Sequence, residues 1–120
     1  MKKLKATNPE LIGLIQELKK KSREKQTEVW GYLAECLLAS KRSRKAVNVS
    51  QLNRHTKDGD VVAVPGKVLG AGQVNHPITV AAFAFSDRAQ SKILQAKGNC
   101  LSIRDLMEEN PEGTEVNVIG

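Results

Sequence analysis

Aromatic residues are scarce in this chain of 120 residues, and Trp30, Tyr32, Phe83 and Phe85 are the full set. Proteins that stack unpaired bases present an aromatic platform on their surface. These four rings do not supply one, because Trp30 fits the apolar stripe of a helix and is better placed in the core. If a nucleic acid is bound, we therefore expect contact with its phosphates and sugars.

Cysteine, histidine and long apolar runs are also few. Cys36 and Cys100 lie far apart without C-x-x-C spacing, so we expect two reduced, half-buried thiols and no disulfide. His55 and His76 have no Cys, Asp or Glu at zinc-binding spacing, which argues against a metal site. No apolar run approaches the roughly 18 residues of a membrane span, and the start of the chain turns polar at residues 7–9. A soluble, cytoplasmic protein is expected.

The motifs of nucleotide-binding loops and active sites are absent as well. In the segment from Pro65 to Gly72, Lys67 precedes Gly70, whereas a phosphate-cradling loop has its lysine after the last glycine and directly before a helix. Asn75 stands where a dinucleotide motif needs its third glycine. No serine or cysteine has a residue that could act as its general base at the sequence spacing of a catalytic motif. We expect no enzyme, no cofactor and no small-molecule substrate.

Two interpretations of the same glycine-rich segment stay open. It fits a tight turn between two strands. It also fits a bend at which the backbone approaches RNA closely and Lys67 contacts a phosphate.

Positive charge is abundant and unevenly placed. Up to Lys57 the chain has fourteen Lys and Arg against five Glu, a net charge of +9. Beyond Lys57 it has five basic against eight acidic residues, a net charge of −3. A basic half joined to a mildly acidic half is typical of a protein that places one face on a polyanion, although an ordinary solvated surface is the alternative.

Three basic clusters stand out in the first half. Positive charges at residues 19–21 are favoured at the end of a helix without any RNA, but Arg23 and Lys25 extend the cluster beyond that need. Residues 41–45 carry four positive charges without an acidic neighbour, and such a run repels itself unless an anion neutralises it. Nuclear targeting is a weaker interpretation of that run. The predicted RNA contacts are Lys2, Lys3, Lys5, Lys19, Lys20, Lys21, Arg23, Lys25, Lys41, Arg42, Arg44, Lys45, Arg54, Lys57 and Lys67.

Capping residues and apolar spacing predict the helices. Asn8-Pro9-Glu10 opens a helix that runs to about Ser22, and Thr27 caps a second one over residues 28–39. Later helices are expected through Arg54 with Ser50 as cap, from Asp87 to Ala96 with Ser86 as cap and Gly98 as stop, and through Glu109 with Ser102 and Asp105 at capping-box spacing.

Beyond residue 58, short β-branched runs predict strands over residues 61–64, 68–69, 78–83 and 115–119. The fold class is therefore mixed α/β, with N-terminal helices and a basic arm followed by an irregular strand-strand-helix region. Residues 1–57 are expected to be a basic, mainly helical RNA-binding part, and residues 58–120 a globular α/β core, packed together as one structural domain.

Several of these segments together resemble the archaeal and eukaryotic large-subunit ribosomal protein family eighteen-e. The most specific is Val-Pro-Gly-Lys-Val-Leu-Gly at residues 64–70. The others are Thr7-Asn8-Pro9, the Trp30 helix, Val47-Asn48-Val49-Ser50, Asn53-Arg54, Asp58-Gly59-Asp60, Val80-Ala81-Ala82 and Phe85-Ser86. One departure is Ala96-Lys97-Gly98-Asn99-Cys100, where the family more often has paired glycines and an acidic residue.

The resemblance implies a structural protein of the large ribosomal subunit, related to the bacterial fifteen family, that binds large-subunit ribosomal RNA and lies beside other ribosomal proteins. It also implies an irregular superhelix of strand-strand-helix turns, and the short length suggests an archaeal member. The alternative is a non-ribosomal basic adaptor that docks an acidic protein partner.

Overall fold

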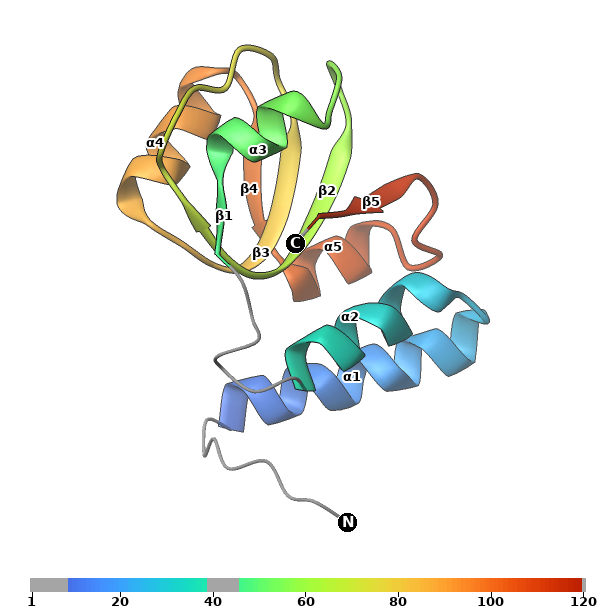
Figure 1. Ribbon diagram of the computed structural model, residues 1–120. Coiled ribbons are helices and arrows are strands. Elements are labelled where there is room, and N and C mark those ends of the chain that lie inside the picture. The colour runs from blue at the N-terminus through green and yellow to red at the C-terminus, as the bar shows by residue number, and fades with distance from the viewer. Residues whose placement is uncertain (1–8, 39–45, 120) are drawn as a thin grey trace.

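The computed structural model describes residues 9–38 and 46–119, with the side chain of Glu10 excepted. A helical hairpin of α1 (Pro9–Lys25) and α2 (Glu28–Leu38) lies beside a parallel sheet (Figure 1). Three shorter helices, α3 (Val49–Arg54), α4 (Asp87–Gln95) and α5 (Ile103–Glu109), alternate with the strands. The mixed α/β class with N-terminal helices is confirmed. None of the described helices is long and apolar enough to cross a lipid bilayer.

Every strand pair in the sheet is parallel. The strands β1 (Val47–Asn48), β2 (Val61–Leu69), β3 (Thr79–Phe85) and β4 (Asn99–Ser102) follow one another in space. A fifth strand, β5 (Val116–Val118), pairs with the first half of β2, while β1 pairs with its last two residues. Both short strands therefore share the edge of β2 that faces away from β3.

The strand β2 is continuous, which corrects the prediction of two strands and overturns the tight turn between them, one of the two interpretations of this segment. Its register against β3 shifts between Val64 and Lys67, so that β2 gains one residue at a β-bulge. Pro65 has no N–H to donate to the ladder, and a bulge is the place where a strand tolerates that loss. The bulge bends β2 (Figure 1), and its end consequently runs along β1.

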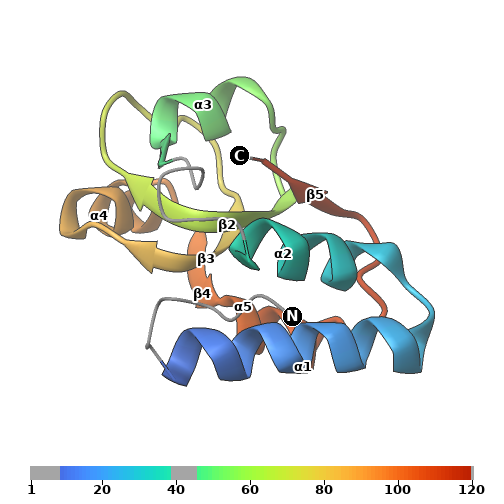
Figure 2. The same cartoon turned by 60° about the horizontal axis from the view of Figure 1, so that its bottom comes forward.

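Side chains of β2 and β3 alternate between two hydrophobic cores. Ala63 and Ala81 point to a core formed with α1, α2 and α5, in which Trp30 and Leu18 are fully buried. Val62, Val64, Val80 and Ala82 point to a second core beneath α3 and α4. Figure 2 shows the sheet between these helices, with the hairpin below it and α3 above it. Small alanines on the first side leave room for the large side chains of the hairpin.

Two of the predicted caps, Ser86 and Ser102, are confirmed, and Asn8 lies outside the described residues. The hydroxyl of Ser86 accepts a hydrogen bond from the N–H of Ala89 at 3.1 Å, and that of Ser102 accepts one from Asp105 at 3.0 Å. Ser50 is not a cap, which corrects that prediction, because α3 begins at Val49 and its N-cap is Asn48, two residues before Ser50. The side-chain oxygen of Gln51 accepts a hydrogen bond from the Asn48 N–H at 3.2 Å.

Strand β4 and the two-residue β1 were missing from the sequence prediction. The end of α4 also differs from it, since Lys97 and not Gly98 has the left-handed conformation, with a φ of 69°. Gly98 is required for another reason, because a Cβ there would collide with the carbonyl of Ile78.

Candidate nucleic-acid interface

Eight of the fifteen predicted RNA contacts lie in the part of the chain that the structure describes. The other seven, Lys2, Lys3, Lys5, Lys41, Arg42, Arg44 and Lys45, lie outside it. The described ones occupy the end of α1, the turn after α3, and β2. The structure therefore does not bring them together on one element.

The cluster at the end of α1 has five cations and one carboxylate over residues 19–25. Because successive helical residues are rotated by about 100°, Lys19 and Arg23 share one side of α1, and Lys21 and Lys25 share another. Lys20 lies between them, away from the buried Leu18. The cluster consequently surrounds the helix end instead of forming a single flat face.

Glu24 partly neutralises this cluster. One of its oxygens lies 3.9 Å from the Lys20 ammonium and the other 3.9 Å from that of Lys21. Both pairs are long and exposed, and such pairs contribute about 0–1 kcal/mol. Lys19, Arg23 and Lys25 make no ion pair with any residue in the described ranges. Unpaired within the described ranges, these three side chains can neutralise an external anion.

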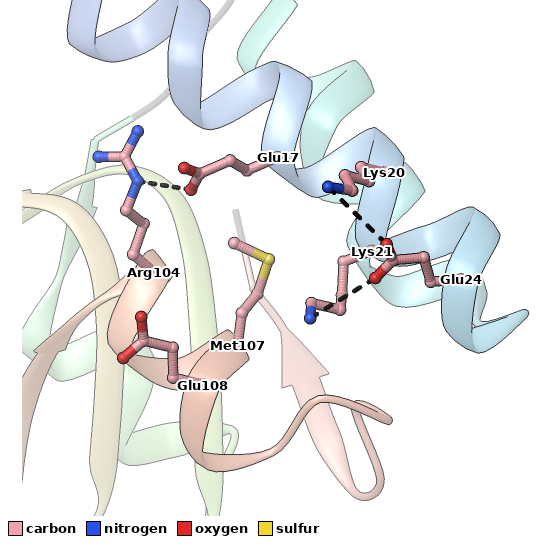
Figure 3. A pocket seen from close by; sticks show the side chains of 7 residues that line it. All are labelled: Glu17, Lys20, Lys21, Glu24, Arg104, Met107 and Glu108. Carbon is pink, nitrogen blue, oxygen red and sulfur yellow. Dashed lines mark hydrogen bonds and ion pairs between the residues drawn. The ribbon is translucent and has the colours of Figure 1, made fainter.

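A pocket of about 240 Å³ lies between α1 and α5, below this cluster. Figure 3 shows Arg104 of α5 directed at Glu17 of α1, where its Nε donates to the carboxylate at 2.6 Å. The lining residues are Glu17, Lys20, Lys21, Glu24, Arg104, Met107 and Glu108. Three carboxylates balance three cations, so the pocket has no net charge that would hold a phosphate.

The remaining predicted contacts are exposed on the sheet side of the molecule. Arg54 ends α3, Lys57 lies in the following turn, and Lys67 lies just after the bulge of β2. The backbone N–H of Lys57 donates to the Asp60 carboxylate at 2.9 Å, which fixes the turn and leaves the ammonium outside. None of these three side chains is paired with an acid among the described residues.

The glycines of the predicted bend are required by internal packing. Gly72 has a φ of 93°, and a Cβ there would collide with Ser50. At Gly70 a Cβ would lie 2.6 Å from the Cγ of Arg88. Both glycines thus admit neighbouring side chains, which explains them without any RNA.

Sequence reasoning missed two cations at this bend, Arg88 and Lys92. The Lys92 ammonium donates to the carbonyl oxygens of Gly70 and Gly72 at 2.7 and 2.6 Å. The available signal was weak, because both residues lie on an amphipathic helix in the half of the chain with a net negative charge. Only the fold brings that helix to the glycine-rich loop.

The thiols agree with their prediction, and His76 lies beside Thr56. Cys36 and Cys100 are free and half-buried, and burial raises the pKa of the Cys100 thiol. His76 Nε2 lies 2.7 Å from the hydroxyl of Thr56, which itself donates to the Leu52 carbonyl at 2.6 Å. No group of three potential metal ligands occurs within residues 9–38 and 46–119.

Comparisons with known proteins identify the family. A family model described as ribosomal protein 60S L18 and 50S L18e matches residues 1–119. The large ribosomal subunit protein eL18 of Methanospirillum hungatei is 46% identical over 113 residues, covering 94% of this chain and 93% of that protein. The chain belongs to this family. The eL18 proteins of Methanococcus maripaludis and Methanothermobacter thermautotrophicus are 44% and 42% identical, each over 119 residues. Those matches cover 99% of this chain and 99% and 98% of the two proteins.

The family membership confirms the resemblance found in the sequence, and the relatives are archaeal as expected. The segment at residues 64–70 that carried the resemblance is the bulged half of β2 and the first loop glycine. Its proline and glycines thus have a structural reason, since they bend the central strand and admit Arg88.

Proposed function

We propose that this protein is a structural constituent of the large subunit of cytoplasmic ribosomes and that it binds and stabilises large-subunit ribosomal RNA. The observation that carries the proposal is the match of a ribosomal protein family over residues 1–119, together with relatives named as large-subunit proteins. Membership in such a family favours a structural constituent over an enzyme. Neighbouring ribosomal proteins are expected partners.

The proposed mechanism is neutralisation of phosphates where RNA helices approach one another. Lys19, Arg23 and Lys25 support it, because they are exposed on α1 and lack acidic partners among the described residues. Arg54, Lys57 and Lys67, which form no ion pair within the described residues, add a second group of charges. The basic runs at residues 2–5 and 41–45 belong to the same proposal. Such contacts release counterions and recognise RNA shape more than base sequence.

The first experiment follows the protein in native lysate on a sucrose gradient with magnesium, with and without ribonuclease. Co-migration with the large subunit and release by ribonuclease are expected. Migration as a free small protein in both samples would contradict the ribosomal role. A single protein partner that survives nuclease treatment would favour the basic adaptor that docks an acidic protein.

A second experiment measures the affinity of the purified protein for large-subunit ribosomal RNA as a function of salt. About 6 to 10 phosphate contacts should lose on the order of a thousandfold in affinity between 50 and 200 mM salt. Replacing Lys19 and Arg23 by Met should lower the slope of log affinity against log salt by about 1.4 to 1.8. An affinity that barely changes with salt would refute phosphate neutralisation.

A further inference from the structure

The loop after β2 is held rigidly on both sides. On one side, Lys92 of α4 binds the carbonyl oxygens of Gly70 and Gly72. On the other side, the Asn48 side chain accepts from the Ala71 N–H at 3.3 Å, and that of Asn53 accepts from the Asn75 N–H at 3.0 Å. The Ala71 carbonyl also accepts from the Ser50 N–H at 3.2 Å. Residues 70–76 therefore form one surface with α3 and α4, which we name the α3–loop–α4 surface.

Arg88 is the cation that this surface presents in a fixed position. Its Cβ, Cγ and Cδ pack over Gly70, which has no side chain to displace them. The residue is nevertheless exposed, and its guanidinium makes no hydrogen bond or ion pair with another described residue. An arginine whose stem is already ordered loses less entropy when its planar fork binds a phosphate through two hydrogen bonds.

The charge around Arg88 is mainly positive, with the neighbouring Asp87 as the exception. Residues 46–56 and 61–86 contain no Asp or Glu, and Asp87 is the one acidic residue in 61–104, against five cations. All five acidic residues that follow lie in 105–115, on α5 and the turn before β5. α5 packs in the core with α1 and α2, whereas α3 and α4 cover the other core. Five of the eight acids beyond Lys57 thus lie on the side of α5, while Asp58 and Asp60 in the turn after α3 and Asp87 on α4 are the other three.

We propose that the α3–loop–α4 surface is a second site for RNA phosphate, distinct from the end of α1. Arg88 contacts the phosphate, and Lys92 is a positioning residue that holds the loop beneath it. Lys67 and Arg54 supply further positive charge from the strand before the loop and from the helix beside it. This inference rests on the proposed function, which already includes Arg54 and Lys67, and it adds Arg88 as a contact and Lys92 as a positioning residue.

The test compares two matched arginine variants of the full-length protein, Arg88→Met and Arg104→Met. Each removes one positive charge and keeps an apolar stem, but Arg104 lies on α5 and is paired with Glu17. The probe is ribosomal RNA extracted from purified large subunits, titrated between 50 and 200 mM salt. Arg88→Met should bind about tenfold more weakly and lower the salt slope by about 0.7 to 0.9, the value for one lost phosphate contact. Arg104→Met should keep the wild-type slope.

Lys92→Met separates positioning from contact. It should weaken binding while leaving the salt slope unchanged, because the Lys92 ammonium is bound to carbonyls and not to a phosphate. Equal affinity and slope for Arg88→Met and Arg104→Met would overturn the second site and leave the proposed function intact. A wild-type protein that fails to bind this RNA would overturn the proposed function itself. Urea unfolding of each variant verifies that the compared proteins are folded.

Discussion

At the scale of single residues, glycine has different roles at different places in this fold. Gly98 is buried where α4 turns back to β4, and a Cβ there would collide with the backbone of Ile78. Gly13, in contrast, lies within α1, where an added Cβ would meet only the far end of the Arg104 side chain at 3.2 Å. The Ile78 carbonyl, just before β3, is held by a hydrogen bond from the Asn99 N–H at 3.0 Å, whereas the end of an arginine side chain moves easily.

The two glycines should therefore respond to alanine with opposite signs. Gly98→Ala should lower the free energy of unfolding by about 2 kcal/mol or more, as overpacking against a fixed backbone does. Gly13→Ala should raise it by about 0.5 to 1 kcal/mol, because alanine is the better helix former. Urea unfolding measures both, and a stable Gly98→Ala variant would contradict the packing at this turn.

At the scale of elements, α4 ends in a Schellman motif with an unusual residue. The N–H of Gly98 donates to the Ile93 carbonyl and that of Lys97 to the Leu94 carbonyl, both at 2.9 Å. The motif places Lys97 in the left-handed region, a position that glycine usually fills. This is the segment in which the chain departs from the paired glycines that the family resemblance implies.

Lys97→Gly should stabilise the protein. A non-glycine residue in the left-handed region costs about 1 to 2 kcal/mol of stability, and glycine removes this cost. Glycine also raises the entropy of the unfolded chain, which lowers the stability by about 0.4 to 1 kcal/mol. A net gain of about 0.5 to 1 kcal/mol is expected in urea unfolding. Ala96→Gly is the matched control, because Ala96 has a φ of −82° and its replacement should destabilise. A loss of stability in Lys97→Gly would show that the lysine side chain itself supports the turn.

At the scale of the whole molecule, the two hydrophobic cores share the sheet. Alternate residues of β2 and β3 belong to opposite cores, so neither core can open without disturbing the strands of the other. Two segments from the first 57 residues, β1 and α3, belong to the sheet and to the second core. The division of the chain at residue 57 into a basic part and a globular part, packed as one domain, stays a proposal.

Unfolding tests that proposal directly. Fluorescence of Trp30 reports the first core, in which the ring is fully buried and its Nε1 donates to the Pro111 carbonyl at 2.7 Å. Its urea transition should coincide with that of far-ultraviolet circular dichroism, as a single cooperative unit requires. Gly98→Ala, on the side of the second core, should shift both curves equally. A shift of the dichroism curve alone would indicate two independent units.

The sequence by itself determined what depends on neighbouring residues. The caps Ser86 and Ser102, the apolar stripes of α1 and α2, and the place of Trp30 in the core were all predictable, because each arises within one turn or one helix. The family could also be identified from its bulged segment. Strands β1 and β4 could not be predicted, because two and four residues are too short for a periodic signal and their partners are distant.

Only the tertiary structure decided the properties that join distant segments. It made β2 one strand across Pro65 and Gly66, because pairing with β1, β3 and β5 stabilises it on both sides of the bulge. It also placed Arg88 and Lys92 against a loop about twenty residues earlier in the chain. In the net charge of the chain beyond Lys57, the acidic residues of α5 outweigh the positive charge of Arg88 and Lys92. In the fold, the sheet separates α5 from α4.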